Sequence, residues 1–573
     1  MNKGIRLLSV LTAVLLLQSF LLSGCSTKDN EKIENNQGSN TVNEDKNSND
    51  KNNNESDNDM DNKEEQKENN DSEIDLVEYN LGSGEIKQSS GVTMPYDMVG
   101  EIAIPKEGEK HPIVFVLHGS HVIEDYNKDR YDLGFEYLLK SLAEKGFLAV
   151  TINVNAQHVL EYGEPIKHER LVNIFNDHLT KLESAIKGES DDFGIDLKDK
   201  GDLTQIALVG HSRGGGALDS VINDQKDRGN DNIFAILKIA PANVIVIEND
   251  NPDIPTGIIL PQYDGDVVNL DGQTTFDILK EDKSRKSFAS LIFLKGAGHN
   301  FFNDNVKEDD REFYSDLTED DRVVFLTREQ QRQFLIDYSI DFLNKALGKK
   351  VETGLFNVDE PTVDKAYGLD VKTSYLTSDR LEIIKATSED KIKKNDLQGN
   401  NVIQDIKVKY LIESYIPNKD ELLNFDHPSN FDGYGLFRFN YTNNKGTFTI
   451  EIPVNKKDMS DYKALSLYLA LNPGSELNKS KENQALAIIL NDNKGKEAKV
   501  ILDDNTAALT WTEGHSRTNE NTTYWSLKTP LSEARIPLKE FKDLDLSDIA
   551  SITLQFDQKE SGSILLRDIS LTK

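Results

Sequence analysis

Hydrophobic and polar positions between residues 76 and 348 alternate between two periods. Short runs of apolar residues, typical of strands that are buried on both faces, begin with Ile113–Leu117. The next segment places Phe135, Leu138 and Leu142 at helical spacing and ends at Gly146. Further apolar runs follow at residues 147–152, 205–209, 233–239, 256–260 and 290–294. Such alternation predicts a mostly parallel sheet flanked by helices on both faces.

The last helix of this region is marked at both ends. Thr327–Gln330 fits a capping box, apolar residues follow at helical spacing, and Gly348 is placed to end the helix. We therefore expect a domain over residues 76–348.

Residues 349–573 change to the alternating pattern of exposed strands. Residues 436–441 and 447–454 alternate around Asn443–Gly446, which predicts a hairpin. Short strands are also expected at residues 465–470, 485–490, 551–556 and 563–569. This pattern predicts an all-β sandwich over residues 349–573, with residues 349–430 forming either its first strand or an extra subdomain.

The N-terminal segment reads as a targeting signal. Lys3 and Arg6 precede a mainly apolar run from Leu7 to Leu22, too short to span a bilayer, and the run is followed by Cys25. Leu22–Cys25 resembles the lipobox of bacterial lipoproteins, which implies cleavage after residue 24 and lipidation of Cys25. The alternative interpretation is an uncleaved membrane anchor. Lipidation predicts an extracytoplasmic protein anchored to the cell membrane and exposed at the surface.

Composition narrows the remaining possibilities. Residues 25–75 are rich in asparagine and acidic residues and contain no aromatic residue, so we expect a disordered tether. The whole chain carries 99 acidic against 66 basic residues and a net charge of −33, which argues against a nucleic-acid partner. Cys25 is the only cysteine, so intramolecular disulfides and thiolate metal sites are excluded. We expect neither a metal nor an organic cofactor.

One motif points to a nucleophile. Gly210–Gly214 matches G-x-S-x-G, follows a predicted strand and enters a predicted helix, as a nucleophile elbow requires. We therefore predict that Ser212 is the nucleophile. A second copy of four of these letters, Gly514–Arg517, lies in a polar stretch and is interpreted as a surface loop.

A nucleophilic serine needs a base, and the base needs an acid to orient it. His299 is the only histidine between Ser212 and residue 348, and it follows a predicted strand. Asp264 and Asp266 also follow a predicted strand and compete for the role of the acid. The order serine, acid, histidine is that of the α/β-hydrolase fold.

The oxyanion hole, and the roles of His118 and Arg213, are assigned to residues that follow the predicted strands. The backbone N–H groups of Ser120 and Arg213 are predicted to form the oxyanion hole. His118 is expected to shape the turn before Ser120. The guanidinium of Arg213 is expected to pair with an acid such as Glu124 or Asp125, or else to bind a substrate carboxylate.

Residues 95–347 resemble secreted bacterial α/β-hydrolases of the polyester-hydrolase, cutinase-like and dienelactone-hydrolase-like group. The resemblance is carried by five short segments at residues 116–119, 138–147, 210–215, 264–267 and 298–302. It favours Asp266 as the acid, because Val267–Val268 resembles the acid loop of that family. It implies a serine hydrolase for carboxylic esters that works through an acyl-enzyme, with Ser212, His299 and Asp266 as the triad.

Two features depart from that family. Arg213 occupies a position where related esterases often carry an uncharged residue, so the family does not define the substrate. An acidic insert at residues 303–321 separates His299 from the last helix and is expected to be either a lid or a solvated loop.

The end of the chain resembles a galactose-binding-like jelly roll related to carbohydrate-binding modules, on residues 534–541, 549–556 and 564–569. Trp511, Tyr524 and Trp525 are candidates for a platform under sugar rings, although aromatic residues of a sandwich also serve its core. The expected partner is an ester substrate, either small or polymeric and linked to glycan. Two alternatives stay open: a glycan-binding lipoprotein with a vestigial hydrolase domain, and a serine peptidase.

Overall fold

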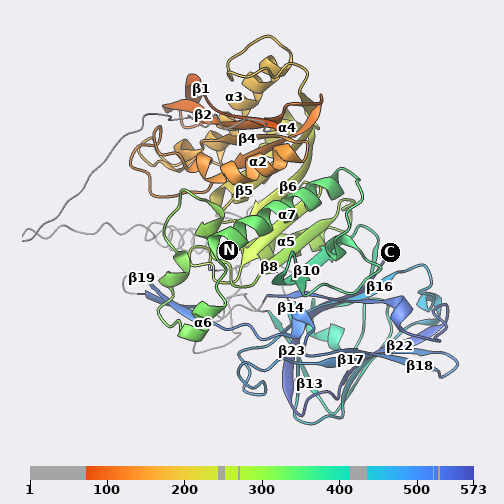
Figure 1. The fold of residues 1–573 in the computed structure, drawn as a ribbon. Helices are drawn as coiled ribbons and strands as arrows, with labels where there is room; N and C mark the ends of the chain where they lie inside the picture. Colours follow the sequence, from red (N-terminus) through yellow and green to blue (C-terminus); the bar gives the residue numbers. More distant parts are fainter. Residues whose placement is uncertain (1–72, 243–251, 269–270, 413–434, 520–521, 527–529) are drawn as a thin grey trace, which may run out of the picture. The chain divides into compact units, whose positions relative to one another are not determined.

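The computed structural model describes residues 73–573 apart from residues 243–251, 269–270, 413–434, 520–521 and 527–529 (Figure 1). The described residues fall in one compact unit, Glu73–Lys573. The predicted signal segment, Cys25 and the predicted tether lie outside the described residues. No helix in the described part of the chain is both long and apolar enough to cross a membrane.

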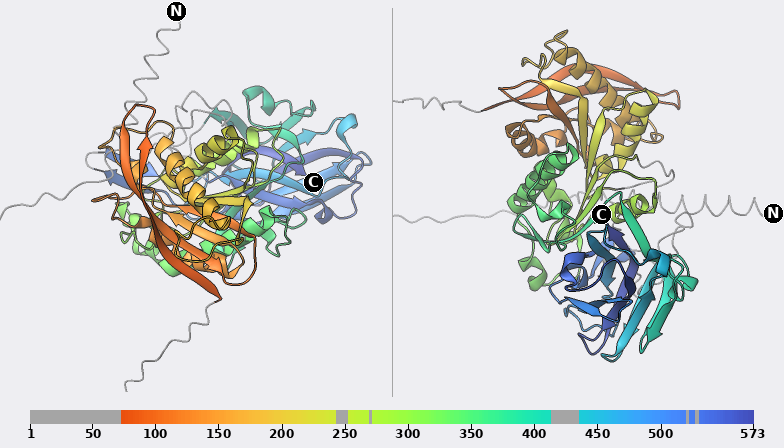
Figure 2. Two further views of the ribbon diagram at one scale, coloured as in Figure 1. Left: turned by 90° about the horizontal axis from the view of Figure 1, so that it is seen from above. Right: turned by 90° about the vertical axis from the view of Figure 1, so that its right-hand side faces the viewer.

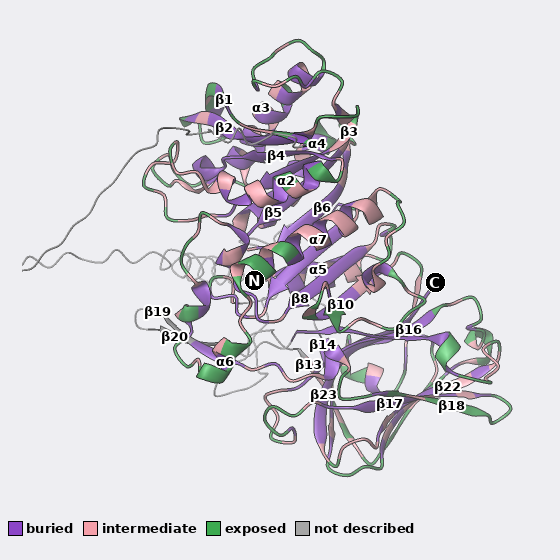
Figure 3. Cartoon of the chain, viewed as in Figure 1, coloured by how far each residue is buried: buried purple, intermediate pink, exposed green. Residues whose placement is uncertain are grey.

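A ten-stranded mixed sheet forms the larger part of this unit. Its strand order is β1-β2-β4-β3-β5-β6-β7-β8-β10-β9, and the pairs from β4 through β8 are parallel. The first strands are β1 (Ile74–Lys87), β2 (Thr93–Pro105), β3 (His111–Leu117), β4 (Leu148–Ile152) and β5 (Gly201–His211). They are followed by β6 (Ile233–Ile239), β7 (Thr256–Pro261), β8 (Ala289–Leu294), β9 (Lys365–Ala366) and β10 (Leu369–Leu376). The runs predicted as buried strands therefore form the parallel centre of the sheet, and Figure 3 shows these strands buried.

Helices cover both faces of this sheet (Figures 1 and 2). They are α2 (Glu136–Glu144), α3 (Glu169–Ile186), α4 (Arg213–Asp227), α5 (Asp271–Glu281) and α7 (Arg328–Ala346), whereas the short α6 (Glu319–Val323) lies in the segment before α7. Apolar side chains of α2 and α7 pack in one cluster with β3, β5 and β8, whereas α3 and α4 pack on the opposite face. The alternation of side chains along each strand produces these two cores. The predicted capping box at Thr327 is present at the start of α7.

The mixed sheet extends beyond the domain boundary that was predicted at residue 348. β10 pairs antiparallel with β8 from Val371–Leu294 to Leu376–Ala289, so the mixed sheet continues beyond residue 348. The antiparallel hairpin of β1 and β2 also extends the sheet at its other edge. A boundary at Gly348 was wrong because the strand that completes the sheet comes after the helix that the sequence marks as the last.

Two further sheets form a β-rich region after β10. One has the order β13-β14-β23-β16-β21 with β11 also pairing β23, and the other has the order β12-β15-β22-β17-β18. The strands are β11 (Arg380–Lys385), β12 (Asn401–Gln404), β13 (Lys407–Ile412), β14 (Gly435–Tyr441), β15 (Gly446–Glu451) and β16 (Ala464–Leu471). The remaining strands are β17 (Leu486–Asp492), β18 (Glu497–Leu502), β21 (Ser532–Pro537), β22 (Ile549–Phe556) and β23 (Gly562–Thr572). A hairpin of β19 (His515–Asn519) and β20 (Thr522–Ser526) forms a separate two-stranded sheet.

The predicted hairpin of residues 436–454 was wrong. The two strands exist as β14 and β15, but they belong to different sheets, and apolar side chains from both pack into one core. Alternation of apolar and polar residues predicts which segments are strands, whereas the choice of partner depends on segments far away in the sequence.

The β-rich region is joined to the mixed sheet by a shared core. Residues of β7, α5 and β8 pack in one apolar cluster with residues of β14, β16 and β23. Polar contacts accompany it, including the ion pair of Lys280 with Asp568 at 3.1 Å. The two regions are therefore packed against each other and are not separate globular bodies.

Candidate active site

Ser212 lies in a sharp turn between β5 and α4. Its backbone has φ 54° and ψ −127°, a strained combination for a residue other than glycine. The turn needs glycines around it: a Cβ on Gly210 would lie 2.7 Å from the backbone of Gly214 and Gly215, and one on Gly214 would lie 2.4 Å from the carbonyl oxygen of His118. Backbone strain of this kind at a strand-to-helix turn is the geometry that exposes the serine of a nucleophile elbow.

The two predicted oxyanion donors lie on segments that meet at Ser212. A Cβ on Gly119 would lie 2.6 Å from Cβ of Ser212, so the backbone before Ser120 passes directly over the serine. The N–H of Arg213 begins α4. Within the described part of the chain, neither the N–H of Ser120 nor that of Arg213 donates a hydrogen bond to a protein acceptor. Both donors are therefore available to a ligand.

His299 follows β8 and is held by Asp264. Nδ1 of His299 lies 3.0 Å from Oδ2 of Asp264, and both side chains are buried. Asp266 is half-exposed and lies on the other side of the ring, with Oδ2 3.6 Å from Nε2 of His299. The preference for Asp266 as the orienting acid was therefore wrong, and the alternative, Asp264, occupies the Nδ1 position.

The backbone around Asp264 explains this outcome. Oδ1 of Asp264 accepts hydrogen bonds from the N–H groups of Asp266 and Val267, which turns the chain around the Asp264 side chain. The same turn directs Asp266 toward solvent. Two carboxylates two positions apart are thus given opposite environments by one tight turn.

Nε2 of His299 is buried and, in the described residues, has no hydrogen-bond partner. No hydrogen bond joins it to Ser212, although the two loops are in contact through His211, whose Nε2 lies 3.0 Å from the carbonyl oxygen of His299. The rings of His211 and His299 have centroids 4.7 Å apart. Catalytic hydrogen bonds are often long without substrate, so this arrangement is compatible with proton transfer between Ser212 and Nε2.

Charges around His299 favour its protonated form. Burial disfavours the imidazolium, but the carboxylates of Asp264, Asp266 and Asp310 outweigh burial and raise the pKa of His299 to about 9. The neutral imidazole that a general base requires is therefore the minor form at neutral pH.

Asp310, in the insert, was not singled out by the sequence. Its side chain is fully buried and accepts hydrogen bonds from the N–H groups of Gly265, His299 and Asn300, each at 2.8 Å. One carboxylate thus ties the loop of Asp264 to the loop of His299. The only signal that could have drawn attention to it was an aspartate in an acidic segment that follows the histidine.

The insert at residues 303–321 is neither wholly solvated nor detached. Asn303, Asp310 and Arg311 are buried, and Nη1 of Arg311 donates to the carbonyl oxygens of Gly296 and Leu326. These bonds anchor the insert to the loop before His299. The expectation of a solvated loop was wrong because two of the acidic residues that suggested it, Asp310 and Asp321, are buried and hydrogen-bonded.

His118 has a structural role. Its Nε2 accepts a hydrogen bond from the N–H of Val154, so Nδ1 carries the proton and donates to the carbonyl oxygen of Gly119 at 2.7 Å. Both ring nitrogens are occupied by backbone, and burial lowers the pKa of His118. The geometry thus agrees with the interpretation that His118 shapes the turn.

Arg213 has no acidic partner. Within the residues that the structure describes, no carboxylate lies within ion-pair distance of its guanidinium. Asp125 instead pairs with Lys128 at 2.6 Å, and the N–H of Glu124 donates to Asp129. The expected pairing of Arg213 with Glu124 or Asp125 was wrong, and the residue that follows Ser212 is a half-buried cation.

The second copy of the motif is also not a surface loop. His515 and Ser516 begin β19, and their side chains are buried. Nε1 of Trp511, in the preceding segment, donates to Glu513 at 2.9 Å, and its side chain is half-buried. Tyr524 and Trp525 lie in β20, but their side chains are outside the described part of the structure, so the predicted sugar platform stays a prediction.

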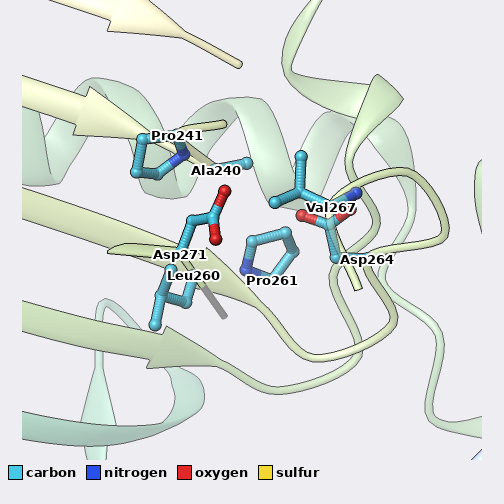
Figure 4. A pocket seen from close by; sticks show the side chains of 7 residues that line it. All are labelled: Ala240, Pro241, Leu260, Pro261, Asp264, Val267 and Asp271. Atoms are coloured by element: carbon cyan, nitrogen blue, oxygen red, sulfur yellow. Dashed lines mark hydrogen bonds between the residues drawn. The ribbon is translucent and has the colours of Figure 1, made fainter. Parts of the chain in front are cut away.

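A small pocket adjoins Asp264 (Figure 4). It is lined by Ala240, Pro241, Leu260, Pro261, Asp264, Val267 and Asp271. Figure 4 shows Asp264 and Asp271 on opposite sides of Pro261. Neither Ser212 nor His299 lines this pocket. No group of three histidine, cysteine, aspartate or glutamate side chains suited to a metal ion occurs among the described residues.

Comparison of the chain with protein-family models finds no match, and comparison with curated proteins finds none either. The interpretation of this site therefore rests on its geometry and on the sequence motifs.

Proposed function

We propose that this protein is a serine hydrolase of carboxylic esters, with Ser212 as nucleophile, His299 as general base and Asp264 as the orienting acid. The observation that carries the proposal is the strained turn at Ser212, with two unoccupied N–H donors beside it. Strain costs roughly 1–3 kcal/mol and persists where the surrounding structure holds it for function. A buried His–Asp pair on the adjacent loops supplies the other half of the machinery.

In the proposed reaction Oγ of Ser212 attacks the ester carbonyl carbon while Nε2 of His299 takes the hydroxyl proton. The carbonyl oxygen becomes an oxyanion and accepts hydrogen bonds from the N–H groups of Ser120 and Arg213. His299 then protonates the leaving alcohol as the C–O bond breaks, which leaves an acyl group on Ser212. Water repeats the sequence and releases the acid. Asp264 stabilises the imidazolium that forms in each half.

The fold supports the same proposal. A largely parallel sheet, helices on both faces and the chain order Ser212, Asp264, His299 are those of the α/β-hydrolase fold. We propose that the first region belongs to this fold and that the β-rich region is a jelly roll. The lipobox-like segment before Cys25 supports a surface-anchored enzyme.

The alternative that the hydrolase region is vestigial is disfavoured by the completeness of the site. An inactive relative has no need to keep a strained serine, a buried histidine–aspartate pair and two free N–H donors together. A peptidase uses the same groups, and the structure holds no feature that favours an amide over an ester.

Labelling by a fluorophosphonate probe tests the proposal directly. The full chain should be labelled on Ser212, the label should be lost in Ser212→Ala, and hydrolysis of p-nitrophenyl butyrate should fall by at least about 1,000-fold. Ser516→Ala is the matched control, because it alters the serine of the second copy of the motif. Equal labelling and turnover in Ser212→Ala and the wild type would falsify the proposal. Amide substrates on the same preparation distinguish a peptidase.

A further inference from the structure

The β19–β20 hairpin, called the arm below, belongs to the β-rich region but does not join either of its two sheets. Figure 1 shows β19 beside α6, away from the strands of the sandwich. The segment that leads to the arm is fixed on the mixed sheet, because Nζ of Lys372 in β10 donates to the carbonyl oxygen of Thr510 at 2.8 Å. The arm thus carries residues 515 and 516 to the insert that follows His299.

Backbone hydrogen bonds join the arm to the insert. The N–H of Ser516 donates to both carboxylate oxygens of Asp316 at 2.8 Å. The carbonyl oxygen of Ser516 accepts from the N–H of Ser315 at 2.8 Å and from its Oγ at 3.0 Å. None of these four contacts uses the side chain of Ser516. One residue of the arm, Ser516, is thus fixed to two residues of the insert, Ser315 and Asp316.

The side chain of His515 extends this contact toward Asp264. Its ring is 6% exposed and packs between Tyr263 and Tyr314, with centroid distances of 5.4 and 5.8 Å. Its Nδ1 and Nε2 lie 3.5 Å from Asp316 and 3.8 Å from Asp321. Both tyrosines are buried. The imidazole therefore packs against both tyrosine rings, and Tyr263 is also in contact with Phe325.

Each of these tyrosines is tied to the proposed triad acid. Tyr263 directly precedes Asp264, and its N–H donates to the carbonyl oxygen of Ala297 at 2.8 Å. The hydroxyl of Tyr314 donates to the backbone carbonyl oxygen of Asp264. The backbone of Asp264 is thus held from two sides by residues that pack on His515.

We propose that His515 is a positioning residue and that the arm of the β-rich region completes the catalytic site by holding Asp264 against His299. This inference rests on the proposed function. It makes the β-rich region a part of the hydrolase machinery, in addition to any binding role it has. A displacement of about 1 Å at a catalytic group can reduce the rate about 100-fold, so a contact that reaches the acid only through tyrosines can control turnover.

The test compares single variants of the full chain on p-nitrophenyl butyrate. His515→Ala should lower kcat by about 10- to 100-fold with KM little changed, because the acid loop is displaced while the substrate site is not touched. His515→Phe keeps a ring between Tyr263 and Tyr314 and should recover most of that loss. Tyr314→Phe removes the hydroxyl from Asp264 and should show the same kind of defect.

Ser516→Ala is the matched control on the arm. It keeps the N–H and carbonyl oxygen that contact the insert, so its kcat and KM should equal those of the wild type. If His515→Ala does not fold, Asp316→Ala decides, because it breaks the arm–insert contact at a half-exposed side chain. The expected result is a loss of kcat in Asp316→Ala in the same direction.

The pH profile separates a positioning role from a general loss of stability. His299 faces the carboxylates of Asp264, Asp266 and Asp310 and the ring of His211. If Asp264 is displaced from His299 in His515→Ala, the imidazolium loses its main ion-pair partner and the pKa of His299 falls. The acidic limb of the kcat/KM profile should therefore move to lower pH. A folded His515→Ala with the kcat and pH profile of the wild type would overturn the inference. Failure of the proposed function would look different, since the wild-type chain itself would then not react with a fluorophosphonate.

Discussion

The carboxylate of Asp310 accepts a hydrogen bond of 2.8 Å from the backbone N–H of His299. Two more bonds, from Gly265 and Asn300, make Asp310 the point at which the acid loop and the histidine loop are joined. Burial and the charge of Asp264 raise the pKa of Asp310 to about 6. The insert therefore contributes structure to the site, whether or not it also covers a substrate.

We expect Asp310→Asn to lower kcat/KM for p-nitrophenyl esters by about 100-fold. In the variant an amide NH₂ group replaces one of the two carboxylate oxygens that accept hydrogen bonds from backbone N–H groups in the wild type, and it cannot accept them. Loss of acceptors for buried donors should also reduce the free energy of unfolding by roughly 1–3 kcal/mol. Steady-state kinetics and urea unfolding measure the two effects. Asp320→Asn, an equal change of charge at an exposed position of the insert, should alter neither.

The pH dependence of activity should reflect His299. The proposed base acts only when neutral, and its pKa of about 9 means that kcat/KM should rise as pH increases through that value. Because the folded-state pKa lies above the ordinary value of 6.5, protonation of His299 also stabilises the fold below pH 6.5, and this contribution is lost as pH rises through about 9. A profile of kcat/KM against pH on a neutral ester measures the first effect.

Asp266→Asn tests the cause of that raised pKa. Asp266 favours the imidazolium from the Nε2 side, so its removal should move the acidic limb to lower pH and raise activity at pH 7 to 8. Asp264→Asn should instead abolish most of the activity, because it removes the partner of Nδ1. Asp227→Asn at the exposed end of α4 is the control for charge alone. The opposite ranking of Asp264→Asn and Asp266→Asn would return the orienting role to Asp266.

The local sequence does not contain the information that distinguishes Asp264 from Asp266. Motifs and chain order could select Ser212, His299 and the loop of Asp264 as candidates, because each follows a buried strand that the pattern of apolar residues predicts. Asp264 and Asp266 are equivalent in that respect. The two carboxylates differ in burial and in contact with His299 because of the turn around Asp264 and the hydrogen bond from Gly265 to Asp310. Asp310 lies more than forty positions later in the sequence, so no local pattern predicts that contact.

Contacts between distant segments also explain the other differences between the sequence-based predictions and the structure. β14 and β15 were recognisable as strands, but their assignment to two sheets depends on β22 and β23 near the end of the chain. His515 lies in a polar segment, which predicts exposure, but it is buried because its ring packs against Tyr263 and Tyr314. β10 completes the mixed sheet from beyond a helix with a well-marked end. In each case the deciding contact joins residues that are distant in the sequence.

Arg213 offers a test of substrate class. Arg213 directly follows Ser212 in the chain, and its guanidinium has no carboxylate partner in the described part of the chain. We expect Arg213→Met to reduce kcat/KM for the mono-p-nitrophenyl ester of glutaric acid about 10- to 100-fold more than for p-nitrophenyl butyrate, since a charged hydrogen bond is worth about 1.5–3 kcal/mol. The backbone N–H of residue 213 is kept.

Arg228→Met is the matched control for this variant, because Arg228 caps the other end of α4 and is exposed. It should leave the ratio of the two esters unchanged. An equal loss for both esters in Arg213→Met would argue that Arg213 acts on the turn and not on a substrate carboxylate.

The contact between the two regions should be required for stability. Arg567 in β23 is buried, donates to Oε1 of Glu281 at 2.8 Å and lies 3.9 Å from Asp277, which is also buried. Burial raises the pKa of Asp277 to about 6 despite the neighbouring Arg567 and Lys280. Removing the cation leaves the buried carboxylate of Asp277 without its ion-pair partner, whereas Glu281 keeps its pair with Lys385. Arg567→Leu should therefore lower the free energy of unfolding by about 3–5 kcal/mol. Lys499→Met, which breaks the more exposed pair with Asp557, should cost less than about 1 kcal/mol. Urea unfolding of the full chain compares the two variants, and similar losses in both would mean that the charges between α5 and β23 contribute little to joining the regions.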